Sequence, residues 1–298
     1  MTIKRSGIIS LADIQNEFGG TAPISISEYY RSGAYTTANN SSVPPAGFVS
    51  INQFYGASKY SPGNTGLITS YRRVILPPNS GNTIYYYCIG GGGGGGGGSS
   101  RITYGYGAGG GGGSGGNSYG SFSANPGDQL DIYVGGAGSA GRARDGPYSG
   151  GTSGGRGGTS IIYKNWTPQV IANGGYGGTV AQYGYNSSSV TPGGLTGTIS
   201  AGSLMRIGDA GQYGQNGIWW AVGGIGGRGF IINAPLNTSS GSYGSGGIGY
   251  YNGYGSARNA VSGTGWGAGG SGGGAMVNAN SPTFNGSPGV QGAVFVWW

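Results

Sequence analysis

The sequence predicts a mainly β and irregular chain: a glycine-rich domain of β-strands and packed polyglycine II helices, preceded by a small module of short helices. Glycine supplies 76 of the 298 residues, whereas an ordinary protein has about 7% glycine. Aromatic residues make up 12% of the chain and charged residues 7%. Disordered chains show the opposite balance, so this composition indicates a folded protein. The composition changes near residue 60, which predicts two domains, residues 1–60 and residues 61–298.

Short capped helices are expected in residues 1–60. Ser10 can cap the start of a helix, and Asp13 at the third helical position can reach back to it. A glycine, Gly19 or Gly20, can end this helix with a left-handed residue. Its apolar face follows from spacings of three and four, and comprises Leu11, Ile14 and Phe18.

A weak internal repeat links the two halves of this module. Residues 46–51 repeat the pattern of residues 6–11, and the capping pattern recurs at Ser25–Glu28 and at Ser50–Gln53. A segment of this length buries little surface by itself. We therefore expect it to dock, either on the second domain or on another protein.

Four segments of the second domain are predicted to be strands, because they are rich in β-branched and aromatic residues. They are residues 83–89, 129–134, 160–163 and 292–298. The last of them ends on the final residue and would fray unless a sheet held it. We therefore expect the first and last of these strands to pair.

The unbroken run Gly90–Gly98 follows the first predicted strand. If it is ordered, we expect an extended helix of the polyproline II type, about 28 Å long at 3.1 Å per residue. Such a helix has no internal hydrogen bonds, so parallel neighbours must satisfy its N–H and C=O groups. Many glycine tracts are therefore predicted to lie side by side as a lattice. The alternative is a series of flexible glycine-serine linkers, but linkers do not contain aromatic residues throughout.

The chain lacks the residues that most enzymes use. It contains no histidine, which removes His-based acid–base catalysis and the commonest metal ligand. Its one cysteine, Cys88, is interpreted as a small buried hydrophobic residue. Asp128 and Asp131, the close carboxylate pair of the second domain, are interpreted as a turn cap and an exposed strand position rather than a glycosidase pair. We expect no enzymatic activity, no cofactor and no metal.

Two Gly-Gly-Arg-Gly motifs, at residues 154–158 and 226–229, are similar to the RGG boxes of RNA-binding proteins. Two isolated copies are few for that role. The net charge of +7 is also spread along the chain without a block of like charge. We therefore expect no nucleic-acid partner.

Aromatic residues between the glycine tracts, together with two arginines, are the candidate receptor-binding residues. Tyr and Trp give a large rigid contact area at low entropic cost, and arginine can meet anionic groups. The alternative is that these rings fill gaps against the glycine lattice. The candidates are Tyr104, Tyr106, Tyr213, Trp219, Trp220, Tyr250, Tyr251, Tyr254, Trp266, Arg142 and Arg144.

Two parts of the sequence resemble proteins of tailed bacteriophages. Residues 8–20, 23–31 and 51–58 look like a short module found in phage structural proteins. From about residue 70, the chain is similar to the glycine-rich domains of phage tail fibres and minor tail proteins. It is also similar to tail-fibre adhesins in which polyglycine II helices stack between variable loops. The residues with this similarity are Tyr87–Gly90, the element Pro126–Gly138, repeated Gly-Gly-x-Gly-Gly and the closing Gly292–Trp297.

The resemblance implies a virion protein, and we expect a tail-fibre or tail-tip adhesin. Its expected partners are other virion proteins through residues 1–60, and a bacterial outer-membrane protein or surface polysaccharide. A homo-oligomer, such as a trimer, or attachment to an oligomeric fibre is expected. The amino terminus has no long apolar run, so synthesis in the host cytoplasm without a signal peptide is expected.

Two alternatives remain open. One is a purely structural virion component, such as a head fibre, a decoration protein, or a neck or tail accessory protein. The other is a non-viral glycine-lattice protein, such as an ice-binding or cell-wall protein, although irregular glycine spacing argues against a flat ice-binding face.

Overall fold

The structure is a computed structural model of the chain. It describes residues 3–4, 6–33, 35–36, 40–57, 63–77, 80–101, 105–143, 151–181, 197–201, 204–206, 210–212, 214, 220–233, 237–240, 248–250, 260–274 and 284–298.

Helices occupy the beginning of the described chain and strands the remainder. The helices are α1 (Leu11–Phe18) and two 3₁₀ helices, η1 (Ile26–Tyr29) and η2 (Ile51–Phe54). The strands are β1 (Arg72–Ile75), β2 (Thr83–Ile89), β3 (Ser99–Arg101), β4 (Gly105–Gly107), β5 (Asn117–Ser123), β6 (Gln129–Tyr133), β7 (Ser160–Lys164), β8 (Thr167–Ala172), β9 (Ile199–Ala201), β10 (Leu204–Arg206), β11 (Trp220–Val222), β12 (Phe230–Asn233), β13 (Asn237–Ser240), β14 (Ile248–Tyr250) and β15 (Ala293–Trp297). This mainly β and irregular architecture confirms the predicted fold class.

The described residues up to Ala57 have a core of their own, which includes Ile14, Phe18, Tyr29 and Phe54. The predicted caps are confirmed: Ser10 and Asp13 form a reciprocal capping box, and the side chains of Glu28 and Gln53 accept from the N–H groups of Ser25 and Ser50. Gly19 ends α1 with a φ of 86°, but its ψ of −167° is extended. The left-handed cap expected there is therefore wrong in detail.

Two antiparallel sheets pack on each other in the second domain. One has the order β1-β6-β7-β8-β9 and the other β10-β5-β2-β15. Between them lies a single core, to which both sheets contribute alternate residues such as Ile84, Tyr86, Leu130 and Ile162. β15 pairs with β2 along its whole length, from Ala293 opposite Ile89 to Trp297 opposite Tyr85. The predicted pairing of the first and last of the four predicted strands is confirmed.

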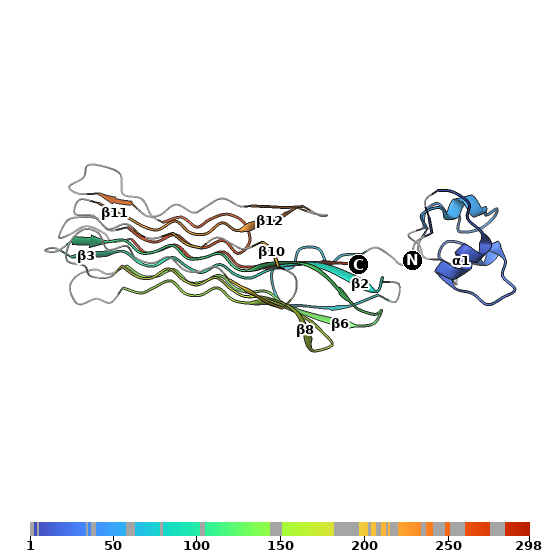
Figure 1. Cartoon of the computed structure of the whole chain (residues 1–298), viewed down its shortest axis with the longest axis horizontal. Coiled ribbons are helices and arrows are strands. Elements are labelled where there is room, and N and C mark those ends of the chain that lie inside the picture. The colour runs from blue at the N-terminus through green and yellow to red at the C-terminus, as the bar shows by residue number, and fades with distance from the viewer. Residues whose placement is uncertain are drawn as a thin grey trace.

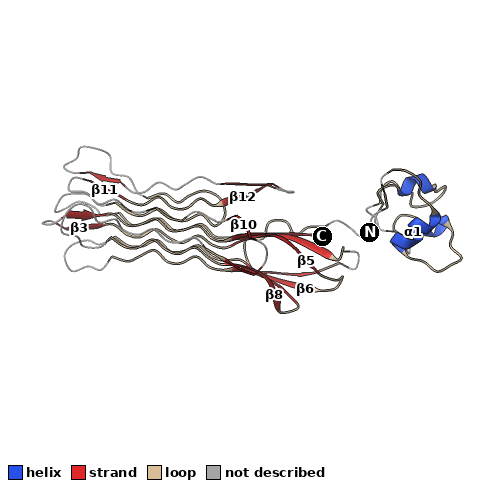
Figure 2. Ribbon diagram, in the orientation of Figure 1, coloured by secondary structure: helices blue, strands red, loops and turns tan. Residues whose placement is uncertain are grey.

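Most strands of the two sheets continue directly into extended segments that run side by side to the far end of the domain (Figures 1 and 2). Residues 90–98 follow β2, residues 108–116 lead into β5, and residues 134–143 follow β6. Residues 151–159 lead into β7, and residues 173–181 follow β8. We refer to these segments, with residues 267–274 and 284–292, as the lattice. The lattice extends from the end of the sheets that is opposite the β7–β8 turn.

Gly90–Gly98 lies at the centre of this lattice. Its successive N–H groups donate in rotation to residues 108–116, 151–159 and 284–292, at 2.8–3.2 Å. Its carbonyl groups from Gly91 to Gly97 accept in rotation from residues 173–181, 135–143 and 267–274. A helix with three residues per turn points every third residue in the same direction, so it can bond to different neighbours on all sides. The predicted polyglycine II packing of this run is confirmed.

The direction of the neighbours differs from the expectation. The N–H groups of Gly90, Gly93 and Gly96 donate to Gly116, Gly113 and Gly110, so that pair is antiparallel. The carbonyls of the central run accept instead from segments of parallel direction, as when Gly138 and Gly141 donate to Gly92 and Gly95. The expected all-parallel arrangement is wrong, because a chain that turns back at the end of each segment alternates its direction.

The number of glycines in each turn of a lattice segment depends on how many neighbouring segments surround it. Each of Gly90–Gly98 faces backbone, and a Cβ added at any of them would lie 1.8–2.4 Å from a carbonyl oxygen. In residues 135–143, which bond to three neighbouring segments, every third residue is a buried glycine: Gly135, Gly138 and Gly141. The intervening residues are small or polar and largely exposed. Glycine is thus required only where another backbone approaches.

Candidate functional site

The far end of the lattice gathers hairpins from distant parts of the sequence (Figure 1). The β3–β4 hairpin lies there and pairs Ser100 with Tyr106. β11 lies against β4 and pairs with β14, so that Trp220 is opposite Tyr250. Three predicted candidates, Tyr106, Trp220 and Tyr250, are therefore brought to one end of the domain.

The other candidate receptor-binding residues do not all lie at the far end of the lattice. Arg142 is exposed near the same end, where its N–H donates to Thr152 Oγ1 at 2.9 Å. Trp266 lies elsewhere, because its backbone exchanges hydrogen bonds with Phe230, which begins β12 at the sheet-side end of residues 223–229. It is half-buried and does not belong to the far end. The candidates outside the described residues are Tyr104, Tyr213, Trp219, Tyr251, Tyr254 and Arg144.

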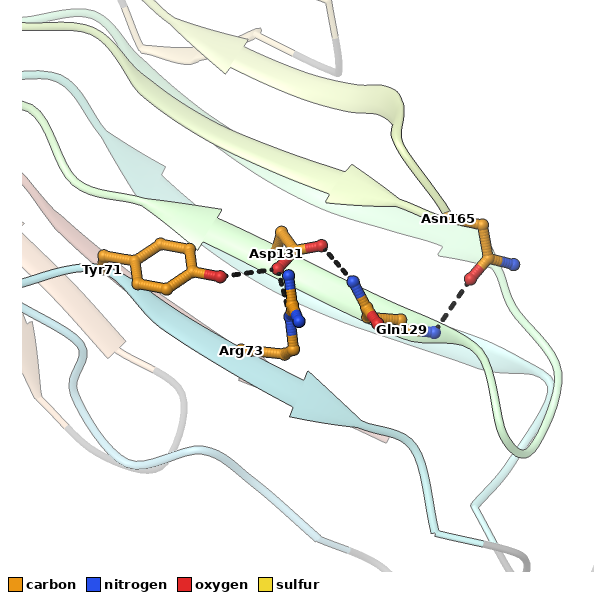
Figure 3. A network of polar contacts seen from close by, with 5 residues as sticks. All are labelled: Tyr71, Arg73, Gln129, Asp131 and Asn165. Atoms are coloured by element: carbon orange, nitrogen blue, oxygen red, sulfur yellow. Dashed lines mark hydrogen bonds and ion pairs between the residues drawn. The ribbon is translucent and has the colours of Figure 1, made fainter.

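A polar network occupies the outer face of the other end of the domain, on the sheet that contains β1 and β6 (Figure 3). Asp131 is only 1% exposed. Its Oδ1 accepts hydrogen bonds from Arg73 Nε at 2.7 Å and from the Tyr71 hydroxyl at 2.8 Å. Gln129 Nε2 donates to its Oδ2. The interpretation of Asp131 as an exposed strand position is wrong, because β1 places Arg73 directly opposite it in the sheet.

These contacts control the ionisation of the network. Burial by itself raises the pKa of Asp131, but hydrogen bonds from Arg73, Gln129 and Tyr71 outweigh it and hold the pKa below the ordinary value of 3.8. The hydrogen bond to Asp131 raises the pKa of Tyr71 and of Arg73 above their ordinary values. Asp131 is therefore a fixed anion whose oxygens already have donors.

Aromatic rings surround this network. Tyr71 is 51% exposed, Tyr133 is 42% exposed, and their ring centroids are 4.9 Å apart. Trp166, in the turn between β7 and β8, is 70% exposed, and the Arg73 guanidinium lies 5.7 Å from its ring centroid. Sequence reasoning missed these residues because it sought aromatic residues between glycine tracts. The alternation of residues 129, 131 and 133 on one face of a strand was the available signal.

Asp128 has the predicted role of a turn cap. Its carboxylate accepts from the Asn125 N–H and from Asn165 Nδ2, both at 2.8 Å. These hydrogen bonds lower its pKa below the ordinary value. Asp128 and Asp131 therefore accept hydrogen bonds from different donors.

Cys88 is fully buried in the core between the sheets, as predicted, and burial raises the pKa of its thiol to about 12. Within the described ranges, no three His, Cys, Asp or Glu side chains are grouped as metal ligands would be. None of the described helices has the length and apolar character needed to cross a bilayer.

The first RGG-like motif belongs to the lattice. Gly154 and Gly157 donate backbone hydrogen bonds to Gly178 and Gly175, at 2.9 Å each. Arg156 lies over Tyr176, with its guanidinium carbon 4.3 Å from the ring centroid. Its glycines thus have a packing role in residues 151–159.

The internal repeat of residues 1–57 presents two large apolar side chains to solvent. Ile8 is 88% exposed and Phe48 is 87% exposed, at equivalent positions of the repeat. Each follows a glycine of positive φ, Gly7 or Gly47. The carbonyl of each glycine accepts a hydrogen bond from a tyrosine hydroxyl, Tyr55 for Gly7 and Tyr30 for Gly47. Equivalent tyrosine–glycine hydrogen bonds therefore fix the backbone next to both exposed apolar side chains.

Comparison with protein families accounts for the larger part of the chain. A model described as a glycine-rich domain matches residues 69–298. The chain belongs to this glycine-rich domain family. The match begins just before β1 and ends with the last residue, so the family domain contains both packed sheets and the lattice. No curated protein matches the chain.

Proposed function

We propose that the chain is a virion protein of a tailed bacteriophage. In this proposal it is a tail-fibre or tail-tip adhesin that binds the host receptor through the far end of the lattice. Residues 1–60 attach it to other virion proteins. Two observations support the proposal: the sequence resembles phage proteins, and the two ends of the glycine-rich domain differ.

The difference between the two ends of the glycine-rich domain is the observation on which the proposal depends. Both ends of the domain meet beside the sheets, where the Gly63 N–H donates to the Trp298 carbonyl at 3.1 Å and the Trp298 N–H donates back at 3.0 Å. The chain leaves the described lattice at the opposite end, after Ala143, Ala181 and Gly274. Attachment beside the sheets would leave the far end free to bind.

The exposed side chains of Ile8 and Phe48 support the attachment role. Ile8 and Phe48 are 88% and 87% exposed, so nearly all of their apolar surface is open to a partner. Their matched positions in the internal repeat favour a partner that presents two similar apolar pockets.

Binding of the purified, labelled protein to susceptible and receptor-deficient host cells tests the adhesin role by flow cytometry. We expect binding to the susceptible cells alone. Replacing Trp220 and Tyr250 together by serine should weaken this binding at least tenfold, because buried aromatic residues dominate many interfaces. Tyr176→Ala, on the flank of the lattice, is the control and should bind normally. Equal or absent binding to the two cell types would contradict the adhesin role and favour a purely structural virion component.

A further inference from the structure

The turn between β7 and β8 contains a residue that its backbone disfavours. Lys164 pairs with Thr167, so the loop has two residues, Asn165 and Trp166. Their φ angles are 47° and 68°. Two positive φ values identify a type I′ turn, whose preferred sequence is Asn-Gly. Asn165 fits this preference, whereas a bulky residue such as Trp166 is an outlier in the left-handed region.

Holding the turn in place does not require the Trp166 ring. Asn165 does this through three contacts. Its N–H donates to the Gln129 carbonyl at 2.9 Å, its Oδ1 accepts from the Gln129 N–H at 2.9 Å, and its Nδ2 donates to Asp128. The Trp166 ring is 70% exposed, so core packing does not account for it either. Strained residues of this kind are concentrated at functional sites.

The ring has a prepared neighbour in Arg73. The Asp131 carboxylate fixes the guanidinium through Nε, and the guanidinium lies 5.7 Å from the Trp166 ring centroid. The Arg73 side chain is nevertheless 48% exposed. The bond to Asp131 uses Nε and not the two terminal nitrogens, although the guanidinium also has a hydrogen bond with Tyr71. Figure 3 shows that Tyr71 and Gln129 hydrogen-bond to the Asp131 carboxylate, which in turn accepts from Arg73.

Exposed rings lie on this face of the sheet. Trp166 adjoins the Arg73 guanidinium, Tyr71 shares its acceptor on Asp131, and Tyr133 packs on Tyr71. A pyranose ring combines apolar C–H faces, which lie on aromatic rings, with hydroxyl oxygens, which accept from N–H donors. Asp131 neutralises the charge of Arg73, so the surface offers hydrogen bonds without a large net charge. That balance favours an uncharged sugar over an anionic one.

We propose that the surface formed by Tyr71, Arg73, Tyr133 and Trp166 binds a neutral saccharide. Trp166 and the two tyrosines contact the sugar faces, and the terminal nitrogens of Arg73 donate to its hydroxyl oxygens. This site lies on the sheets, at the other end of the domain from the far end of the lattice. It does not depend on the adhesin role of the far end.

The turn itself supplies a sharp test. Trp166→Gly restores the Asn-Gly pair that a type I′ turn prefers, so the variant should melt at the same temperature as the parent or higher. Isothermal titration calorimetry of the full chain with maltotriose, galactotriose and chitotriose should detect binding to at least one of them. Trp166→Gly should weaken that binding at least tenfold. The binding should change less than twofold between 50 and about 500 mM salt, because no charge pair forms.

Tyr176→Ala provides the matched control, since Tyr176 is also an exposed ring beside an arginine, Arg156, but lies on the lattice. It should leave saccharide binding unchanged. The proposal is overturned if none of the three probes binds. It is also overturned if Trp166→Gly binds like the parent while its melting temperature falls, which would give Trp166 a structural role. Preferential binding of trigalacturonate, lost at high salt, would likewise contradict a neutral ligand.

Discussion

At the scale of single residues, Asp131 shows how a charged side chain becomes part of a sheet. It is buried on the outer face because Arg73, Tyr71 and Gln129 each donate to it. A buried carboxylate without such donors would be costly. The pairing of β1 with β6 supplies the most important donor, and β1 was not among the predicted strands.

We predict that Asp131→Asn destabilises the domain by about 1–3 kcal/mol near neutral pH, as expected for the loss of hydrogen bonds to a charged group. The folded-state pKa of Asp131 is lowered, so its contribution is fully present above the unfolded pKa of about 3.9. The contribution is lost as the pH falls through the lower, folded-state pKa. Urea unfolding of the parent and the variant at pH 7 and at pH 2 measures both effects. An equal difference in stability at the two pH values would contradict the assignment.

Cys88 provides a second prediction at this scale. Its thiol is fully buried and its pKa is raised to about 12, so thiolate is scarce and inaccessible in the folded protein at pH 8. We expect iodoacetamide to label Cys88 only at the rate at which the two-sheet core opens. Labelling followed by mass spectrometry, with and without urea, checks this. Rapid labelling without urea would mean that the core is open near Cys88.

At the scale of elements, the lattice segments depend on glycine where backbones meet. A Cβ on Gly94 would lie 1.9 Å from the Ser139 carbonyl oxygen, whereas a Cβ on Gly136 would meet nothing within 4 Å. Because a backbone neighbour cannot rotate away, relief at Gly94 requires the two segments to separate.

We therefore predict that Gly94→Ala costs at least about 1–3 kcal/mol, as overpacking does in protein cores. Gly136→Ala, the matched control, should change the stability by less than about 0.5 kcal/mol. Thermal unfolding followed by circular dichroism compares the two variants. Similar melting temperatures for both would contradict the packing of Gly90–Gly98 at the centre of the lattice.

The elements differ in how far the sequence predicts them. The strands at residues 83–89 and 129–134 were predicted from β-branched and aromatic content, and the run Gly90–Gly98 from its lack of side chains. β1 was not predicted, because Arg72 and Arg73 obscure its pattern. The surface around Trp166 could not be predicted, because it combines β1, β6 and a turn that are adjacent only in the folded sheet.

At the scale of the whole molecule, the domain has two chemically different ends. The sheets bury an ordinary apolar core, whereas the lattice is held by backbone hydrogen bonds between its segments. Most of the lattice segments adjoin a strand that is paired in one of the two sheets, whereas residues 267–274 adjoin none. The sequence predicted both kinds of structure, and it predicted that the strand at residues 83–89 runs into Gly90–Gly98, but not that the two sheets pack on each other.

The uniform central run has a consequence for insertions. A helix with three identical residues per turn has screw symmetry: moving it by one residue, about 3.1 Å along its axis with a rotation of 120°, reproduces it. One glycine inserted after Gly94 should therefore leave every backbone contact of residues 90–98 possible, with the added length passed on towards β3. One residue inserted after Gly138 would instead bring Ala140 to the place of Gly141, where a Cβ would lie 2.4 Å from the Thr152 carbonyl oxygen. The variant with the insertion after Gly94 should melt within a few degrees of the parent, and the variant with the insertion after Gly138 should melt well below it. The uniform run Gly90–Gly98 is therefore the segment that best tolerates a change in length.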